Sequence, residues 1–155
     1  MAGVLTLVLA ACTASGLRPE RTIHCLEISS FPHRVLLGRY ALPENGEFSL
    51  SFIHSVSRTP VRDDYRVDGF RIIQTAETFE THGAGLPSIV DETGVTGWEY
   101  RDGRFVVGMH RPIPRLIVRT DRNYRNHLSI GGVDVNLNAW EDQALEVAVA
   151  PCAAP

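Results

Sequence analysis

The residues best suited to chemistry lie in the segment HSVSRTPVRDDY, residues 54–65. Imidazole changes its charge near neutral pH, so His54 can act as a base, an acid, a metal ligand or a donor to an anion. Arg58 and Arg62 flank Pro60 and can bind an anionic group, and Asp63 supplies a carboxylate. The alternative is structural: His54 ends a strand and its imidazole hydrogen-bonds to a carbonyl of the turn.

A second segment, GAGLP, has unusual backbone properties rather than reactive side chains. Gly83 and Gly85 permit positive φ, and Ala84 between them is too small to block the approach of another group. Pro87 stiffens the exit and holds Leu86 extended. Successive amides in such a loop can bind an anion. The alternative is a tight connection in which the glycines allow close packing.

The sequence evidence for a catalytic or metal-binding site is weak. Ser55 follows His54 directly, and neighbouring residues on a strand point to opposite faces, so the two form a poor catalytic pair. His54, His82 and Asp63 have the side-chain types that bind zinc, but no HxH or HExxH spacing supports a metal site. We therefore expect no catalytic residues, no metal and no cofactor, and an enzyme centred on His54 remains the third hypothesis.

The elements that must position these residues are predicted to be strands. In residues 46–55, Phe48, Leu50 and Phe52 alternate with polar side chains, which is the period of a half-buried strand. Turn residues separate this segment from further strand-like runs, namely 35–42, 60–68, 70–80, 104–109, 115–120, 127–130, 133–137 and 144–150. The pattern predicts an all-β domain, either an antiparallel β-sandwich or a small barrel.

A hairpin through Asp68-Gly69 is expected to bring the two motifs together. The strand from 70 to 80 would return beside the strand from 60 to 68, so GAGLP would leave it near Pro60. We predict that His54, Asp63 and GAGLP share one surface. The segment 88–101 is the least regular and is expected to be a functional loop or a short helix.

The N-terminal segment resembles an export signal. Residues 4–11 are apolar, a length typical of the hydrophobic region of a signal peptide and too short for a membrane-spanning helix. Leu9-Ala10-Ala11-Cys12 resembles a lipobox, in which Cys12 would be lipidated. We expect residues 1–22 to be a signal and tether, and residues 23–155 to form a single β domain. A cleaved signal or a membrane anchor, with Cys12 incidental, is the alternative.

Cysteine usage fits an exported protein, and the charge balance bears on nucleic-acid binding. With Cys12 lipidated, Cys25 and Cys152 remain in the first and last strand-like segments, where they either form a disulfide or stay as separate thiols. The 155 residues include 15 basic and 18 acidic side chains without a basic run, so nucleic acid is not an expected partner.

The short motifs HSV, PVRD and GAGLP resemble the sequence pattern of the bacterial DUF1850 family. Asp63 stands where the family pattern has Glu. The resemblance extends over roughly residues 24–150. Members of this family are small exported or membrane-tethered proteins, often encoded beside TAXI-type TRAP transporters for organic anions. The resemblance therefore implies a periplasmic or cell-envelope protein, held at the membrane through Cys12, whose partner is the membrane subunit or the solute receptor of such a transporter.

Three classes of function follow for the surface that contains His54, Arg58 and GAGLP. We expect a non-catalytic accessory protein that docks on a transporter. The second hypothesis is a small domain that binds or senses an organic anion, and the third is an enzyme. The residues predicted to form the binding surface are His54, Ser55, Arg58, Pro60, Asp63, Gly83, Ala84, Gly85, Leu86 and Pro87.

Overall fold

A computed structural model describes residues 24–81 and 93–152. The strands in these ranges are β1 (His24–Phe31), β2 (Leu36–Ala41), β3 (Glu47–Ile53), β4 (Pro60–Asp68), β5 (Arg71–Phe79), β6 (Val95–Arg101), β7 (Arg104–Ile113), β8 (Leu116–Arg119), β9 (His127–Ile130), β10 (Val133–Asn136) and β11 (Ala144–Pro151). Two short 3-10 helices accompany them, η1 (Arg122–Tyr124) and η2 (Leu137–Trp140). The predicted all-β class is confirmed.

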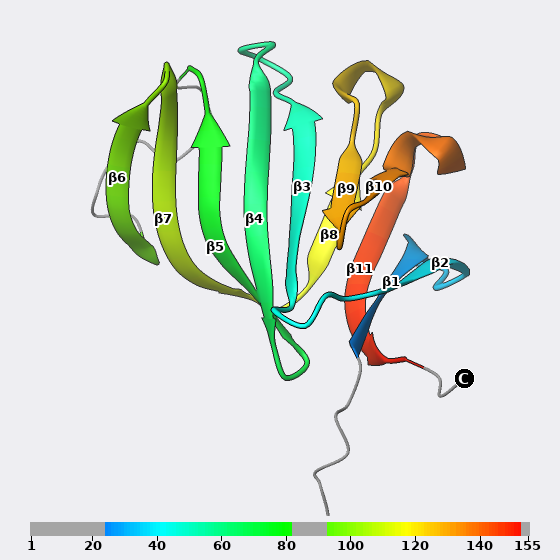
Figure 1. The fold of residues 1–155 in the computed structure, drawn as a ribbon. Helices are drawn as coiled ribbons and strands as arrows, with labels where there is room; N and C mark the ends of the chain where they lie inside the picture. Colours follow the sequence, from blue (N-terminus) through cyan, green and yellow to red (C-terminus); the bar gives the residue numbers. More distant parts are fainter. Residues whose placement is uncertain (1–23, 82–92, 153–155) are drawn as a thin grey trace, which may run out of the picture.

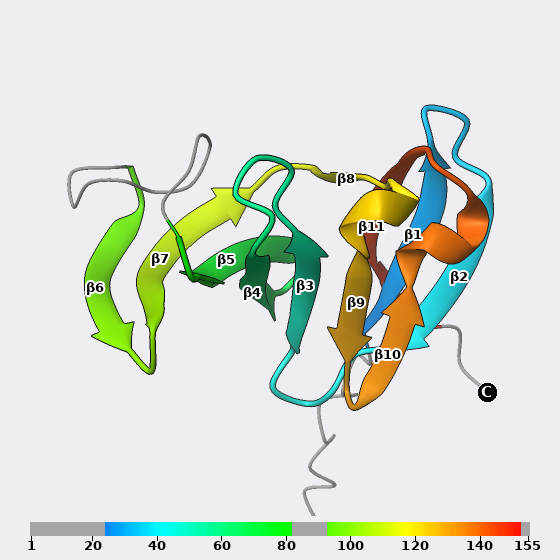
Figure 2. The same cartoon turned by 90° about the horizontal axis from the view of Figure 1, so that it is seen from above.

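The strands form two open antiparallel sheets (Figure 1), so the fold is a sandwich rather than a small barrel. The larger sheet has seven strands in the order β10-β9-β3-β4-β5-β7-β6, and the smaller has four in the order β2-β1-β11-β8. Seen from above, β1, β2 and β11 lie beside β9 and β10, while β7 and β6 form the opposite end of the larger sheet (Figure 2).

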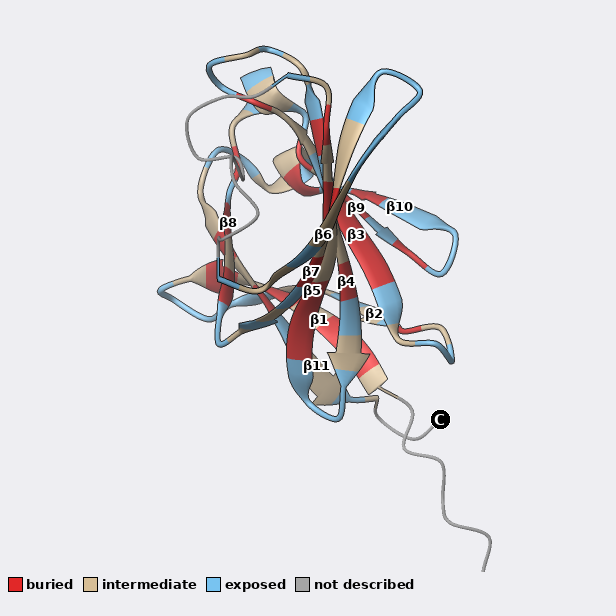
Figure 3. Cartoon of the chain, turned by 90° about the vertical axis from the view of Figure 1, so that its left-hand side faces the viewer, coloured by how far each residue is buried: buried red, intermediate tan, exposed pale blue. Residues whose placement is uncertain are grey.

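The main core lies between the two sheets. Alternate residues of β3 and β9 face inward, among them Leu50 and Leu128, and pack in one cluster with Leu26 of β1 and Leu145 of β11. A second, smaller cluster is built by Val61, Phe79, Val107 and Met109, which belong to β4, β5 and β7. Buried residues occur on both sheets (Figure 3), as expected when each sheet turns one face toward the core.

The segment 88–101 differs from the expectation of a loop or short helix. Its second half is β6, which pairs with β7 at the end of the larger sheet. The periodicity is hard to see because a register shift falls between Val95 and Gly97. Beyond this shift Trp98 and Tyr100 lie on one face, opposite Val107 and Phe105 of β7.

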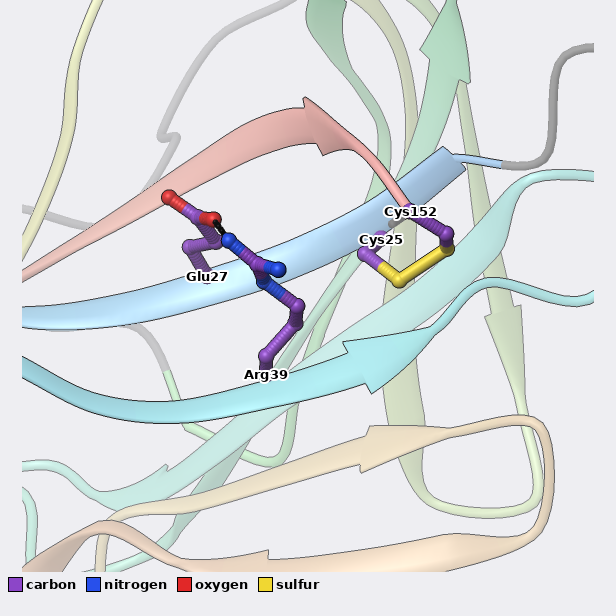
Figure 4. The surroundings of a disulfide bond; sticks show 4 residues. All are labelled: Cys25, Glu27, Arg39 and Cys152. Carbon is purple, nitrogen blue, oxygen red and sulfur yellow. Dashed lines mark hydrogen bonds and ion pairs between the residues drawn. A yellow bond between two sulfur atoms is a disulfide. The ribbon is translucent and has the colours of Figure 1, made fainter. Parts of the chain in front are cut away.

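The first and last strands lie side by side in the smaller sheet. Cys25 of β1 is directly opposite Ala150 of β11, and Cys25 forms a disulfide with Cys152 just beyond the strand (Figure 4). The sequence left this pairing open. An ion pair between Arg39 of β2 and Glu27 of β1 lies nearby on the same sheet.

No helix within residues 24–81 and 93–152 has the length and apolar character needed to cross a membrane. The expected signal and tether, with the lipidation predicted at Cys12, lie outside the described residues.

Candidate functional site

His54 organises the turn between β3 and β4. Its imidazole is only 8% exposed, and its Nδ1 accepts hydrogen bonds from the backbone N–H groups of Val56 and Ser57, at 3.3 and 3.1 Å. The His54 N–H donates to the Thr59 carbonyl, and the Arg58 N–H donates to the His54 carbonyl. An acceptor Nδ1 requires the proton to be on Nε2, so this geometry selects one neutral tautomer.

The outer part of the same turn is exposed. Val56 is 69% exposed, and Ser55 and Arg58 are also exposed. Arg58 has a positive φ of 60°, which places it in a conformation that residues other than glycine adopt infrequently. Its guanidinium lies over the ring of Tyr124 in η1, 5.6 Å from the ring centre, as in a cation–π contact. The turn therefore presents a positive charge on a backbone fixed from inside by His54.

Pro60 and Asp63 follow on β4 but play different parts. Pro60 opens the strand opposite Ile53 of β3, at the exposed edge of the turn. Asp63 lies farther along the strand and faces the interior, on the same side as Val61 and Tyr65. Its carboxylate is thus directed away from the exposed tip of the turn.

Asp63 belongs to an interior polar cluster formed by Asp63, Tyr65, Gln74, Glu77 and Arg111 on three adjacent strands, β4, β5 and β7. The Tyr65 hydroxyl donates to Asp63 Oδ2 at 3.2 Å, and Gln74 Nε2 donates to Asp63 Oδ1 at 3.1 Å. Arg111 Nη1 reaches the Gln74 Oε1 atom at 3.5 Å. Glu77 is directly opposite Asp63 in the strand register.

The surroundings of this cluster shift its proton affinities. Burial raises the pKa of Asp63 from 3.8 to about 6, and the charge of Asp64 adds to the increase. Hydrogen bonds from Tyr65 and Gln74 and the charge of Arg111 oppose it. Burial also raises the pKa of the Tyr65 phenol well above its usual range, together with the negative charge of Asp63. The cluster can therefore take up a proton slightly below neutral pH.

Most of this cluster was missed in the sequence because of a β-bulge. Gln74 and Glu77 are three residues apart, so a regular strand would place them on opposite faces. The register shift between Gln74 and Ala76 turns both toward Asp63. Charged and amide side chains within the otherwise apolar run of β5 were the available signal.

The other motif, Gly83–Pro87, lies outside the described residues. The strand before it has the expected register, because Phe79 at the end of β5 is opposite Val61, one residue from Pro60. The chain thus leaves β5 at the end where β4 begins, and the convergence of GAGLP with His54 stays a prediction. No group of three or more His, Cys, Asp or Glu residues in the described ranges could hold a metal ion.

These features define an all-β sandwich domain with a disulfide between its terminal strands and an ionisable cluster in its interior. The family model for a domain of unknown function, DUF1850, matches residues 48–137, and the chain belongs to this family. The match begins in β3 and ends at the start of η2, so it contains the His54 turn and the interior polar cluster. Comparisons with curated proteins and with solved structures gave no match.

Proposed function

We propose that this chain is a lipid-anchored accessory protein of a TAXI-type TRAP organic-anion transporter, located outside the cytoplasmic membrane, and that it acts by binding rather than by catalysis. The disulfide between Cys25 and Cys152 supports the location, because such bonds persist mainly in oxidising compartments. The family resemblance supplies the transporter as the partner, either through its membrane subunit or through its solute receptor.

The observation that carries the mode of action is the exposed Arg58 on the hydrogen-bonded His54 turn. A guanidinium forms charge-assisted hydrogen bonds with a carboxylate, worth about 1.5–3 kcal/mol each. Val56 adds exposed apolar surface beside it. A charge and an apolar side chain at a protruding turn suit contact with the surface of a protein partner.

The second hypothesis, a domain that binds or senses an organic anion, concerns the same His54 turn, and the interior polar cluster does not offer an alternative anion site. Asp63 and Glu77 provide two carboxyl groups around the single guanidinium of Arg111. Two carboxyl groups beside one guanidinium leave little positive charge for an additional anion, which disfavours its binding. We therefore place recognition at the His54 turn.

The test is solute uptake in cells that contain a TAXI-type transporter and lack this gene. Complementation with the wild-type chain should restore uptake, while Arg58→Ala should weaken the underlying interaction about tenfold or more, the equivalent of one such hydrogen bond. Arg71→Ala is the matched control, because Arg71 is an exposed arginine at the opposite end of β4 and β5 and pairs only locally with Asp68.

Unchanged uptake in the deletion strain would contradict the accessory role. An Arg71 variant as impaired as the Arg58 variant would contradict the assignment to this turn. Turnover of a small molecule by the purified protein would favour an enzyme instead. His54→Ala is unsuitable as a binding probe, because it also removes the acceptor of two turn amides.

A further inference from the structure

A groove of about 480 Å³ crosses the outer face of the larger sheet, opposite to the core. Its floor follows one row of directly paired residues, Ser129 of β9, Ser49 of β3, Asp64 of β4 and Ala76 of β5. These side chains are short compared with the neighbours on either side, so the row forms a trough at right angles to the strands. Its volume falls within the range of about 300–1,000 Å³ typical of small-molecule sites.

Ser49 supplies independent evidence for a ligand. It is 7% exposed, and its hydroxyl makes no hydrogen bond among the residues that the structure describes, although it lines the groove. Other buried polar residues are satisfied: the Ser30 hydroxyl accepts from Val35, Thr120 donates to two carbonyls, and Asn126 accepts from Asp121. Because this hydroxyl opens onto the groove, a ligand with a matching polar group can pair with it.

The groove walls restrict the chemistry of that ligand. The Arg62 guanidinium pairs with Asp64 Oδ1 at 2.8 Å, and Asn45 donates to Glu47 Oε2 at 2.7 Å. Two carboxylates thus face one guanidinium, which disfavours an anion. A cation is disfavoured as well, because Asp64 and Glu47 already have partners in Arg62 and Asn45. The rings of Phe48 and Tyr65 do not offer a face to it either, since they stack on each other in the core at 5.0 Å.

With charged ligands disfavoured, a ligand that carries uncharged hydroxyl groups fits the groove best. A hydroxyl both donates and accepts, so it can pair with the serine hydroxyls, the carboxylate of Asp64 and the guanidinium of Arg62 in turn. We propose that this groove, formed by the Ser129–Ser49–Asp64–Ala76 row, binds a small uncharged polyhydroxylated molecule of monosaccharide or disaccharide size. Ser49 and Ser129 contact the ligand from below, and Asp64 accepts hydrogen bonds from its hydroxyl groups.

The experiment is ligand-observed NMR and calorimetry on the intact protein. The probes are glucose, galactose, trehalose and myo-inositol, with succinate and putrescine as an anion and a cation of similar size. At least one hydroxylated probe should bind with a dissociation constant in the millimolar range or below. Ser49→Val should weaken this binding at least tenfold, because the extra methyl group fills the floor and the hydroxyl is lost.

Ser51→Val is the matched control, because Ser51 lies on the same strand and face but is exposed and outside the groove; it should bind like the wild type. Ser129→Leu blocks the floor from an exposed position and should also abolish binding, even where Ser49→Val impairs folding. Absence of binding by all hydroxylated probes, preference for succinate or putrescine, or equal effects of Ser51→Val and Ser129→Leu would each overturn the proposal.

Discussion

At the residue scale, His54 holds the turn between β3 and β4, and Asp63 belongs to the interior polar cluster. The histidine is nearly buried and holds the turn after β3 through its Nδ1 atom. The carboxylate turns inward, where Tyr65 and Gln74 donate to it. The carboxylate whose pKa is raised therefore lies in the interior polar cluster, and the exposed charge of the His54 turn belongs to Arg58.

Asp63 should make the stability of the protein depend on pH. In the folded state burial raises its pKa from 3.8 to about 6, so between these values the folded protein binds more protons than the unfolded chain. The free energy of unfolding therefore falls as pH rises through this window, by at most roughly 3 kcal/mol for the full shift. Asp63→Asn removes the titration and should leave the protein more stable than the wild type above pH 6.

Urea unfolding at a series of pH values from about 3 to about 8, a range that brackets both pKa values, tests this prediction. The matched control is Asp68→Asn, an exposed carboxylate at the end of the same strand, which should retain the pH dependence of the wild type. The prediction is wrong if Asp63→Asn and the wild type lose stability in parallel as pH rises. Glu77, Tyr65 and Arg111 face Asp63 and remain in every variant compared.

At the scale of elements, turns with positive φ set the paired strands in register. Gly46 precedes β3 with φ of 68°, its N–H donates to the Pro43 carbonyl, and its carbonyl accepts from the N–H of Val67 in β4. The turn thus joins the start of β3 to the end of β4. The bulge in β5 has a comparable effect on side-chain direction, because it brings Gln74 and Glu77 onto one face.

Gly46→Ala should destabilise the fold by more than Gly69→Ala. Both glycines have positive φ, which costs an L-residue about 1–2 kcal/mol. A Cβ at Gly46 would lie 3.1 Å from the Val67 carbonyl oxygen, whereas a Cβ at Gly69 would meet nothing within 4 Å. Thermal and urea unfolding of the two variants measure the difference, and equal losses of stability would show that the contact with Val67 is unimportant.

At the scale of the whole molecule, the smaller sheet depends on the two ends of the described chain. β1 and β11 pair along their full length, and the disulfide links Cys25 to Cys152 across a separation of 127 residues. Both of these strands lie outside the matched region 48–137, which contains the larger sheet. The disulfide therefore links the two central strands of the smaller sheet, which covers one side of the main core.

Replacing both cysteines with serine should lower the free energy of unfolding by about 2–5 kcal/mol, because the bond restricts a long loop in the unfolded chain. The measurement is chemical unfolding of the wild type and of Cys25→Ser/Cys152→Ser, each with and without a reductant. Reductant should destabilise only the wild type. Equal stability of the two proteins without reductant would contradict a structural role for this bond.

The sequence by itself determined the local features of this protein. Alternation of apolar and polar residues in segments such as 46–55 follows from the two-residue period of a strand, and Asp68-Gly69 marked a hairpin that the structure contains. The motifs HSV, PVRD and GAGLP indicated the DUF1850 family, and the family model that matches residues 48–137 confirms it. Each of these signals is contained within a few neighbouring residues.

Only the tertiary structure decided which side chains meet. The bulge in β5, the pairing of Cys25 with Cys152 and the row that aligns Ser129, Ser49 and Asp64 all depend on register between strands that are distant in sequence. A shift of one residue in any of these pairings would turn the same side chains to the opposite face. The interior polar cluster and the outer groove are therefore properties of the assembled sheets, because the packing of both layers, and not local periodicity, selects their register.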